Sequence, residues 1–106
     1  SGLERVLSYR EPVGNVAVTP TGRIFFTVHP ESRTRGNKLL EFVDGAAEPW
    51  PDGRAQQLLF DTPLGVTADA AGRLWVLDHG NHGLRSPRLL AIDLSLMALP
   101  SALSVL

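Results

Sequence analysis

The sequence predicts an all-β fold made of two related antiparallel units, and three observations support this prediction. Residues 15–29 align without a gap with residues 65–79, at a spacing of 50 residues, and residues 38–44 align in the same register with residues 88–94. Each unit contains short runs rich in β-branched and aromatic residues, separated by turn signals. The 10 glycines and 8 prolines favour many turns over long helices. A repeat of this length with several strands in each unit is typical of the blades of a β-propeller.

In the first unit we expect strands at residues 13–19, 23–28 and 38–43. Pro20-Thr21-Gly22 separates the first two strands and is a turn signal, because proline presets φ and glycine accepts a positive φ. The pair Asp44-Gly45 is the turn signal that ends the third strand. The first two strands are therefore expected to form a hairpin.

The end of the first unit is less regular. Residues 46–54 include Pro49-Trp50-Pro51-Asp52-Gly53, and two prolines so close together argue against regular structure in that segment. A short fourth strand is expected after this segment, at residues 56–60.

The second unit repeats the first, with strands expected at residues 64–68, 73–77 and 88–94. The apolar tail, residues 95–106, does not resemble the corresponding part of the first unit, and either a short helix or an apolar strand would suit it. The 106 residues are expected to form one partial-propeller domain. Its parts are a first repeat at about 13–62, a second repeat at about 63–94, and the tail.

Composition limits the classes of partner. A formal net charge of −1 gives no electrostatic reason to expect nucleic acid or an acidic membrane as a partner. The absence of cysteine excludes disulfides, thiolate zinc sites and cysteine nucleophiles, but it does not fix a cellular compartment. The longest apolar stretch is the tail, which is too short and too interrupted to span a bilayer.

The densest polar cluster is Asp78-His79-Gly80-Asn81-His82, in the loop that follows the second strand of the second unit. One interpretation is a ligand-binding or metal-binding patch formed by Asp78, His79, Asn81 and His82, in which neutral imidazoles and side-chain oxygens provide the ligands. The other is a solvated loop whose polar side chains satisfy backbone donors. The spacing matches no strong metal signature, which favours the second interpretation.

His29 occupies the position equivalent to His79 in the repeat. The two imidazoles could line one channel and share a ligand, and His29 is therefore included among the candidate ligand-binding residues. The alternative, which we favour, is that both histidines simply mark the same strand end in two units of common ancestry.

A local excess of positive charge occurs in the two equivalent loops. Its members are Arg33, Arg35, Lys38, Arg85 and Arg88. An anion site is one interpretation, because arginine matches carboxylates and phosphates in geometry. A solvated basic face is the favoured alternative. Aromatic residues do not alternate with these charges, which argues against nucleic-acid binding.

The remaining candidate functional residues are the two tryptophans and one possible combination of serine, histidine and aspartate. Trp75 lies in a nearly continuous apolar strand and is expected in the core. Trp50 lies between two prolines and could pack between blades or against a ligand, with packing favoured. Ser86, His79 and Asp78 could be written as a triad, but no Gly-x-Ser-x-Gly element accompanies them, so no catalytic residue is assigned.

Several segments together resemble a known family. They are GRIFFTVHPESR, KLLEF, EPWPDG, LGVTADAAGRLWVLDHGN and PRLLAIDL. Across residues 13–94 they look like the Yellow and major royal jelly protein family and, more broadly, the six-bladed propellers of the senescence-marker/gluconolactonase kind. The resemblance implies about two blades of a six-bladed ring.

The two branches of this resemblance imply different chemistry. The Yellow-like branch implies a small-molecule pocket near the propeller axis. The lactonase branch implies hydrolysis assisted by a divalent metal, usually calcium, held by acidic or amide side chains at the axial ends of inner strands. The matching positions in this chain are Gly14 and Leu64, and neither has a side chain that can bind a metal. The sequence therefore predicts no metal site and no cofactor.

The sequence leads to two functional hypotheses. The favoured one is a non-catalytic, self-associating, truncated Yellow-like propeller protein that binds a small molecule. The alternative is a fragment of a metal-dependent lactonase-like or esterase-like hydrolase. Because two blades leave open sheet edges and exposed apolar faces, we expect either a fragment of a longer propeller or a homo-oligomer. In the second case, the tail would supply the missing strand or a cover, and exchange of the tail between chains is one way to do so. Neither nucleic acid nor a membrane is expected as a partner.

Overall fold

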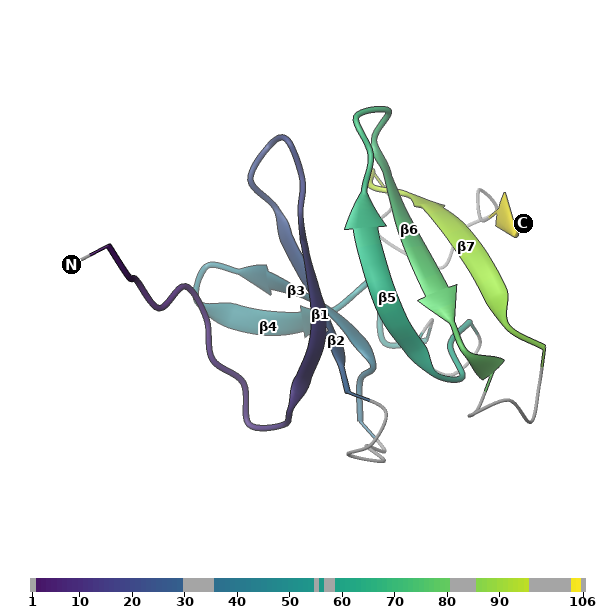
Figure 1. Ribbon diagram of the computed structural model, residues 1–106, viewed down its shortest axis with the longest axis horizontal. Coiled ribbons are helices and arrows are strands. Elements are labelled where there is room, and N and C mark those ends of the chain that lie inside the picture. Colours follow the sequence, from purple (N-terminus) through teal and green to yellow (C-terminus); the bar gives the residue numbers. More distant parts are fainter. Residues whose placement is uncertain are drawn as a thin grey trace.

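The strands of this chain form two antiparallel sheets that lie side by side (Figure 1). The computed structural model describes residues 2–29, 36–54, 56, 59–80, 86–95 and 104–105. Within these residues, the first sheet contains β1 (Val13–Val18), β2 (Ile24–Val28), β3 (Leu39–Val43) and β4 (Ala46–Pro49) in that order. The second sheet contains β5 (Pro63–Ala68), β6 (Arg73–Asp78), β7 (Arg88–Asp93) and the short β8 (Ser104–Val105). The predicted all-β fold with two antiparallel blade-like sheets is confirmed.

The 50-residue repeat is preserved in the strand register. Val16 lies opposite Phe26 in the first sheet, and Val66 lies opposite Val76 in the second. The register shifts near the start of β1, between Val13 and Val16, and it shifts again near the start of β5. The first three strands of the two sheets are therefore equivalent in register, including the irregularity of the first strand.

The fourth strand of the first sheet is not where the sequence predicted it. β4 occupies residues 46–49, within the segment expected to be irregular, because Asp44 and Gly45 form a tight hairpin turn with φ values of 49° and 82°. Two consecutive positive φ angles are typical of the two-residue turn that connects adjacent antiparallel strands. Pro49 ends β4 on the sheet edge, where a missing N–H removes no ladder hydrogen bond.

In the segment predicted as a strand at residues 56–60, residues 57 and 58 lie outside the described part of the chain, and the described residues 56, 59 and 60 are not in a strand. The side chain of Gln56 instead forms hydrogen bonds with the backbone of the first sheet. Gln56 is buried, and its Oε1 accepts hydrogen bonds from the backbone N–H groups of Lys38 (2.6 Å) and Leu39 (3.1 Å). Its Nε2 donates to the carbonyl oxygens of Leu39 and Trp50, both at 3.0 Å. The side-chain amide therefore supplies backbone-like hydrogen bonds at the start of β3.

The tail supplies the fourth strand of the second sheet within the same chain. Val105 lies opposite Leu90 in the position that Pro49 takes opposite Leu40 in the first sheet. Of the two structures that the sequence allowed for the tail, the strand is the one formed at residues 104–105. The remaining tail residues from 96 onward lie outside the described part of the chain.

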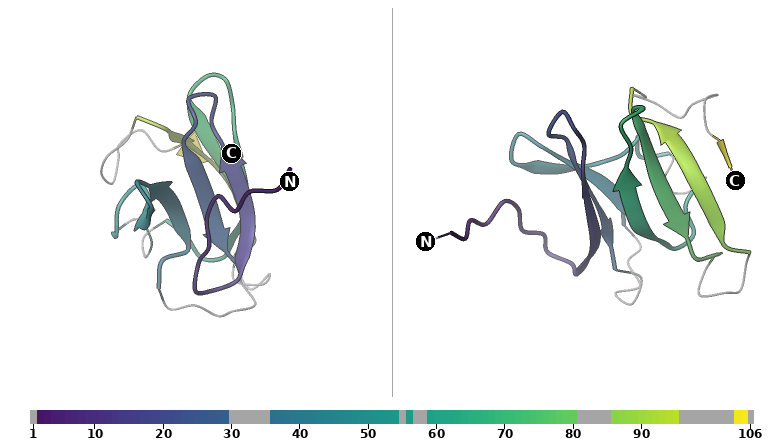
Figure 2. Two further views of the ribbon diagram at one scale, coloured as in Figure 1. Left: turned by 90° about the vertical axis from the view of Figure 1, so that its left-hand side faces the viewer. Right: turned by 45° about the horizontal axis from the view of Figure 1, so that its top comes forward.

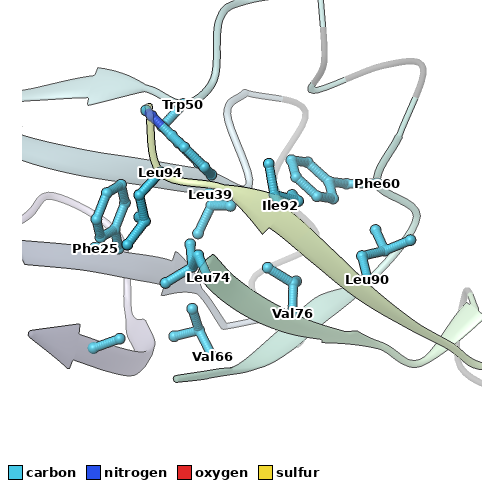
Figure 3. Close-up of a cluster of buried hydrophobic side chains, with 11 residues drawn as sticks. Phe25, Leu39, Trp50, Phe60, Val66, Leu74, Val76, Leu90, Ile92 and Leu94 are labelled. Atoms are coloured by element: carbon cyan, nitrogen blue, oxygen red, sulfur yellow. The ribbon is translucent and has the colours of Figure 1, made fainter. Parts of the chain in front are cut away.

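The main hydrophobic core lies between the two sheets (Figure 3). The face of the first sheet that carries Ala17, Phe25 and Leu39, called here its inner face, packs against the inner face of the second sheet. The second sheet contributes Val66, Leu74, Val76, Leu90 and Ile92 to this core. Trp50 is buried there with its ring centroid 4.9 Å from that of Phe25, so the predicted packing of Trp50 between blades is confirmed.

A smaller core lies on the opposite, outer face of the first sheet. Phe26, Val28 and Leu40 are buried under Leu7 and Tyr9 of the N-terminal segment. The rings of Tyr9 and Phe26 meet edge to face with centroids 5.2 Å apart. The views in Figure 2 place this segment on the side of the first sheet that faces away from the second sheet. It therefore covers part of the outer face.

Candidate functional site

Asp78, the predicted ligand residue at the end of β6, is fully buried, with an exposed fraction of 0%. Its carboxylate accepts hydrogen bonds from three backbone N–H groups, those of Asp61 (2.7 Å), Thr62 (2.9 Å) and Gly80 (2.9 Å). The Arg88 Nη2 lies 3.4 Å from the same carboxylate. A carboxylate with these partners holds the linker before β5 against the end of β6.

The described members of the predicted basic group bind this same linker. The Lys38 Nζ donates to the carbonyl oxygens of Phe60 (3.2 Å) and Asp61 (2.8 Å). The Arg88 Nη2 donates to the carbonyl oxygen of Leu59 at 2.5 Å. Both cations therefore have backbone acceptors and are not simply a solvated basic face. Arg33, Arg35 and Arg85 lie outside the described residues.

The two equivalent histidines occupy equivalent backbone positions. The N–H of His29 donates to the carbonyl oxygen of Pro12 (2.8 Å), and the N–H of His79 donates to that of Thr62 (3.0 Å). His29 is half-buried and His79 is exposed. The other two candidates, Asn81 and His82, lie outside the described residues, so the structure places only part of the predicted ligand patch.

The axial position that the resemblance links to metal binding is tightly packed. A Cβ added at Gly14 would lie 2.6 Å from Leu64 Cδ1 and 2.9 Å from Thr27 Oγ1, so glycine lets the two sheets approach closely there. Among the described residues, no group of three or more histidine, aspartate or glutamate side chains could hold a metal ion. Within the same residues no helix has the length and apolar character needed to cross a membrane.

Thr27 links the two sheets beside Gly14, and sequence inspection did not single it out. Its buried hydroxyl donates to the carbonyl oxygen of Leu64 (2.8 Å) and accepts from the N–H of Asn15 (3.0 Å). The available signal was a lone threonine between Phe26 and Val28 in an otherwise apolar strand. A polar residue at such a position needs a partner.

Replacing Thr27 with valine is expected to lower the free energy of unfolding by about 1–3 kcal/mol, because the Leu64 carbonyl and the Asn15 N–H lose their partner. Valine keeps the volume, so the effect isolates the hydrogen bonds. Urea denaturation measures the loss. The matched control Thr67→Val, at an exposed threonine, should change stability by less than about 0.5 kcal/mol. Equal effects of the two substitutions would contradict the role of Thr27.

Arg23 forms a second polar link between the sheets. Its guanidinium binds Glu41 in a bidentate pair, with Nε–Oε2 at 2.8 Å and Nη2–Oε1 at 3.0 Å. Its Nη1 donates to the carbonyl oxygen of Leu94, just after β7, at 2.5 Å. The guanidinium carbon also lies 5.0 Å from the centroid of the Phe25 ring. The sequence signal for this link was Glu41, a single charge within an apolar strand.

Two open grooves border Arg23. One, of about 470 Å³, is lined by residues of β4 and the segment after it, including Glu48, Trp50 and Asp52. The other, of about 400 Å³, lies between the β1–β2 turn and the β5–β6 turn, with Asp69 and Asp93 on its wall. The Ser95 hydroxyl and N–H hold the pKa of Asp93 below its usual value.

The outer face of the second sheet, which points away from the first, carries an ordered tryptophan. Trp75 is half-buried there and is not part of the inter-sheet core, so its predicted core position is wrong. The Trp75 Nε1 donates to Asp69 Oδ2 at 2.7 Å. The guanidinium carbon of Arg73 lies 5.0 Å from the centroid of the Trp75 ring. The prediction failed because an apolar strand is buried on both faces only when another layer covers it.

Asp69 should titrate far below an ordinary aspartate. The hydrogen bond from the Trp75 indole, followed by the backbone N–H of Arg73, lowers the pKa of Asp69 from 3.8 to about 2. Because the folded-state pKa is the lower one, these contacts stabilise the fold fully above about pH 4, and the stabilisation is lost as the pH falls toward 2. In an NMR titration, the Trp75 indole N–H resonance should move with a midpoint near 2. A midpoint near 4 would contradict this prediction.

Both outer faces expose large apolar side chains. On the second sheet, Leu77 is 41% exposed and Leu89 is 36% exposed, and these two residues lie opposite each other on β6 and β7. On the first sheet, Val16 and Val18 of β1 are 48% and 62% exposed. Contiguous exposed apolar residues on a sheet face indicate a surface that is suited to contact another layer.

The fold and the strand register define a β-propeller-type protein. Within the described residues, two four-stranded antiparallel sheets pack face to face, with β1 and β5 side by side (Figure 1). The first three strands of each sheet repeat at a spacing of 50 residues. The NHL repeat family matches residues 60–85, a range that includes β5 and β6. No curated protein matches the chain.

Proposed function

We propose that this chain is a non-catalytic propeller module of the Yellow-like kind that associates with further copies of itself through its sheet faces. The observation that carries this proposal is that β6 is apolar on both faces. Leu74 and Val76 fill the inter-sheet core, whereas Trp75 and Leu77 point to the outer face. A strand with this pattern is suited to burial between two layers. The Yellow-like assignment is supported by the sequence segments shared with that family.

The test is the mass of the protein in solution, measured by light scattering behind a sizing column. At micromolar concentration the wild-type chain is expected as a multimer, and the variant Leu77→Glu/Leu89→Glu as a monomer. Burial of two leucine side chains contributes about 3 kcal/mol or more to association, so the dissociation constant should rise at least about 100-fold. The control Ala70→Glu, in an exposed turn, should leave the mass unchanged. If the wild-type chain remained a monomer at about 100 µM, the proposal would be overturned. The free energy of association would then be weaker than about 5 kcal/mol.

We also propose that a small molecule binds near the ends of β2 and β6, where His29 and His79 lie. Because the Asp78 carboxylate is buried and accepts three backbone N–H groups, the exposed His79 is the group that remains accessible to a ligand. Screening a fragment library by NMR tests this, with the imidazole resonances of His29 and His79 as the readout. Shifts confined to the grooves around Arg23 would place the ligand elsewhere.

The alternative, a fragment of a metal-dependent hydrolase, makes a different experimental prediction. Calcium should then raise the melting temperature, and a lactone or ester should be hydrolysed. An unchanged melting temperature together with no turnover would leave the non-catalytic proposal in place.

A further inference from the structure

We infer that a second copy of this chain docks head to tail, so that the outer face of its first sheet covers the outer face of the second sheet. This inference rests on the proposed self-association and specifies its geometry. The docked arrangement would reproduce, between chains, the junction that the two sheets already form within one chain.

The repeat makes the two outer faces complementary. Residues that form the inner face of the first sheet correspond, 50 positions later, to residues on the outer face of the second: Phe25 to Trp75, Thr27 to Leu77, Leu39 to Leu89. Residues that form the inner face of the second sheet correspond, 50 positions earlier, to residues on the outer face of the first: Val66 to Val16, Leu74 to Ile24, Ile92 to Phe42. The two outer faces are therefore the two halves of the inter-sheet junction.

The polar link of the junction also has a counterpart. Within the chain, Arg23 packs over Phe25 and donates to the carbonyl oxygen of Leu94 on the neighbouring sheet. Arg73 and Trp75 lie 50 residues after Arg23 and Phe25, and Arg73 packs over Trp75 in the same way. The residue of the first sheet that corresponds to Leu94 is Asp44, 50 positions earlier. Asp44 lies exposed in the β3–β4 turn and offers both a carbonyl oxygen and a carboxylate. Arg73 of one copy can therefore meet an acceptor of opposite charge on the next.

Part of the first sheet's outer face is already occupied. Leu7 and Tyr9 cover Phe26 and Leu40, whereas Val16 and Val18 on β1 remain exposed. Docking is therefore expected to begin along β1. In the chain itself, β1 and β2 contact β5 at the equivalent place, because the Thr27 hydroxyl binds the Leu64 carbonyl.

Head-to-tail contacts between identical chains use two different surfaces, so they either close a ring or continue indefinitely. A propeller closes with roughly four to eight blades. With two sheets in each copy, rings of two to four copies meet this requirement, and light scattering distinguishes them by mass.

The absence of cysteine makes site-specific crosslinking a direct test of this geometry. Two variants are prepared, Leu77→Cys and Val16→Cys, each at an exposed position. In the intrachain junction, the residues equivalent to this pair are Thr27 and Val66, and Thr27 contacts Leu64, two residues before Val66 along β5. A bifunctional thiol reagent with a span of about 10 Å should therefore join the two variants when they are mixed, given a strand rise of about 3.3 Å per residue.

The expected result is a crosslinked dimer in the mixture at a yield several-fold above that of either variant alone. A mixture of Leu77→Cys with Glu48→Cys, which is exposed on β4 away from the proposed contact, is the control and should give little product. Efficient crosslinking of either variant alone would indicate two-fold pairing of identical faces and would overturn the head-to-tail arrangement. A multimer by light scattering that gives no crosslink in any mixture would also overturn it, in favour of contacts through strand edges, while self-association itself would stand. A monomer would overturn the proposed function.

Discussion

Replacing Asp78 with alanine is expected to lower the free energy of unfolding by about 3 kcal/mol, because two buried backbone N–H groups and one partly buried N–H group lose their acceptor at about 1–3 kcal/mol for each buried group. The Arg88 guanidinium would also lose its buried partner. A domain of this size has a total stability of about 5–15 kcal/mol, so the variant should be close to unfolding at physiological temperature. Urea denaturation followed by far-UV circular dichroism measures the change.

Two further variants make this result specific. Asp78→Asn retains one acceptor oxygen and the side-chain volume, so its loss should fall between that of the wild type and that of Asp78→Ala. Asp93→Ala removes a carboxylate whose hydrogen bonds to Ser95 are exposed, and its effect should remain below about 1 kcal/mol. If Asp78→Ala were no more destabilising than Asp93→Ala, the carboxylate would not be holding the linker, and a role in ligand binding would regain support.

The contrast between these aspartates shows why the sequence could not assign the role of Asp78. An aspartate followed by histidine and glycine suits both a ligand site and a structural turn. The distinction depends on Asp61 and Thr62, which lie 17 and 16 residues earlier and bring their N–H groups to the carboxylate only in the folded chain. When a segment that is distant in the sequence buries a polar side chain, the sequence around that side chain carries no pattern that reveals it.

The repeat carried most of the predictable information about the fold. A gap-free alignment at 50 residues implies the same strands and register in the aligned segments, and the structure has the same first three strands with the same register in both units. The fourth strands differ, since β4 follows a two-residue turn whereas β8 lies at residues 104–105. The failure at β4 came from giving more weight to Pro49 and Pro51 than to the Asp44-Gly45 pair. A two-residue turn commits the following residues to pairing, and a proline at the end of an edge strand does not prevent it.

The polar links between the sheets were predictable only in part. Thr27 and Glu41 each interrupt an apolar strand, which signals that a partner exists. Their partners are the carbonyl oxygen of Leu64 and the guanidinium of Arg23, and Arg23 in turn reaches the carbonyl of Leu94. Backbone carbonyls on another sheet have no sequence signature, so only the three-dimensional arrangement identifies them.

The largest effect on the contact between the sheets is expected from Phe25→Ala. Phe25 is fully buried between the two sheets and meets Trp50 edge to face, so its removal leaves a cavity in the main core. A substitution of this kind costs about 3–5 kcal/mol. Because the cavity lies at the junction, amide hydrogen exchange should accelerate in the strands of both sheets, including β5, β6 and β7.

Phe26→Ala is the matched control, since Phe26 is equally buried but lies on the outer face of the first sheet under Leu7 and Tyr9. Its removal should destabilise the first sheet by a similar amount while exchange in β6 and β7 remains slower than in Phe25→Ala. If the two variants gave the same exchange pattern, the chain would unfold as a single unit whichever face is disturbed. If Phe25→Ala left the second sheet unchanged, each sheet would be stable alone, and a sheet of this fold would not require a neighbour on its face.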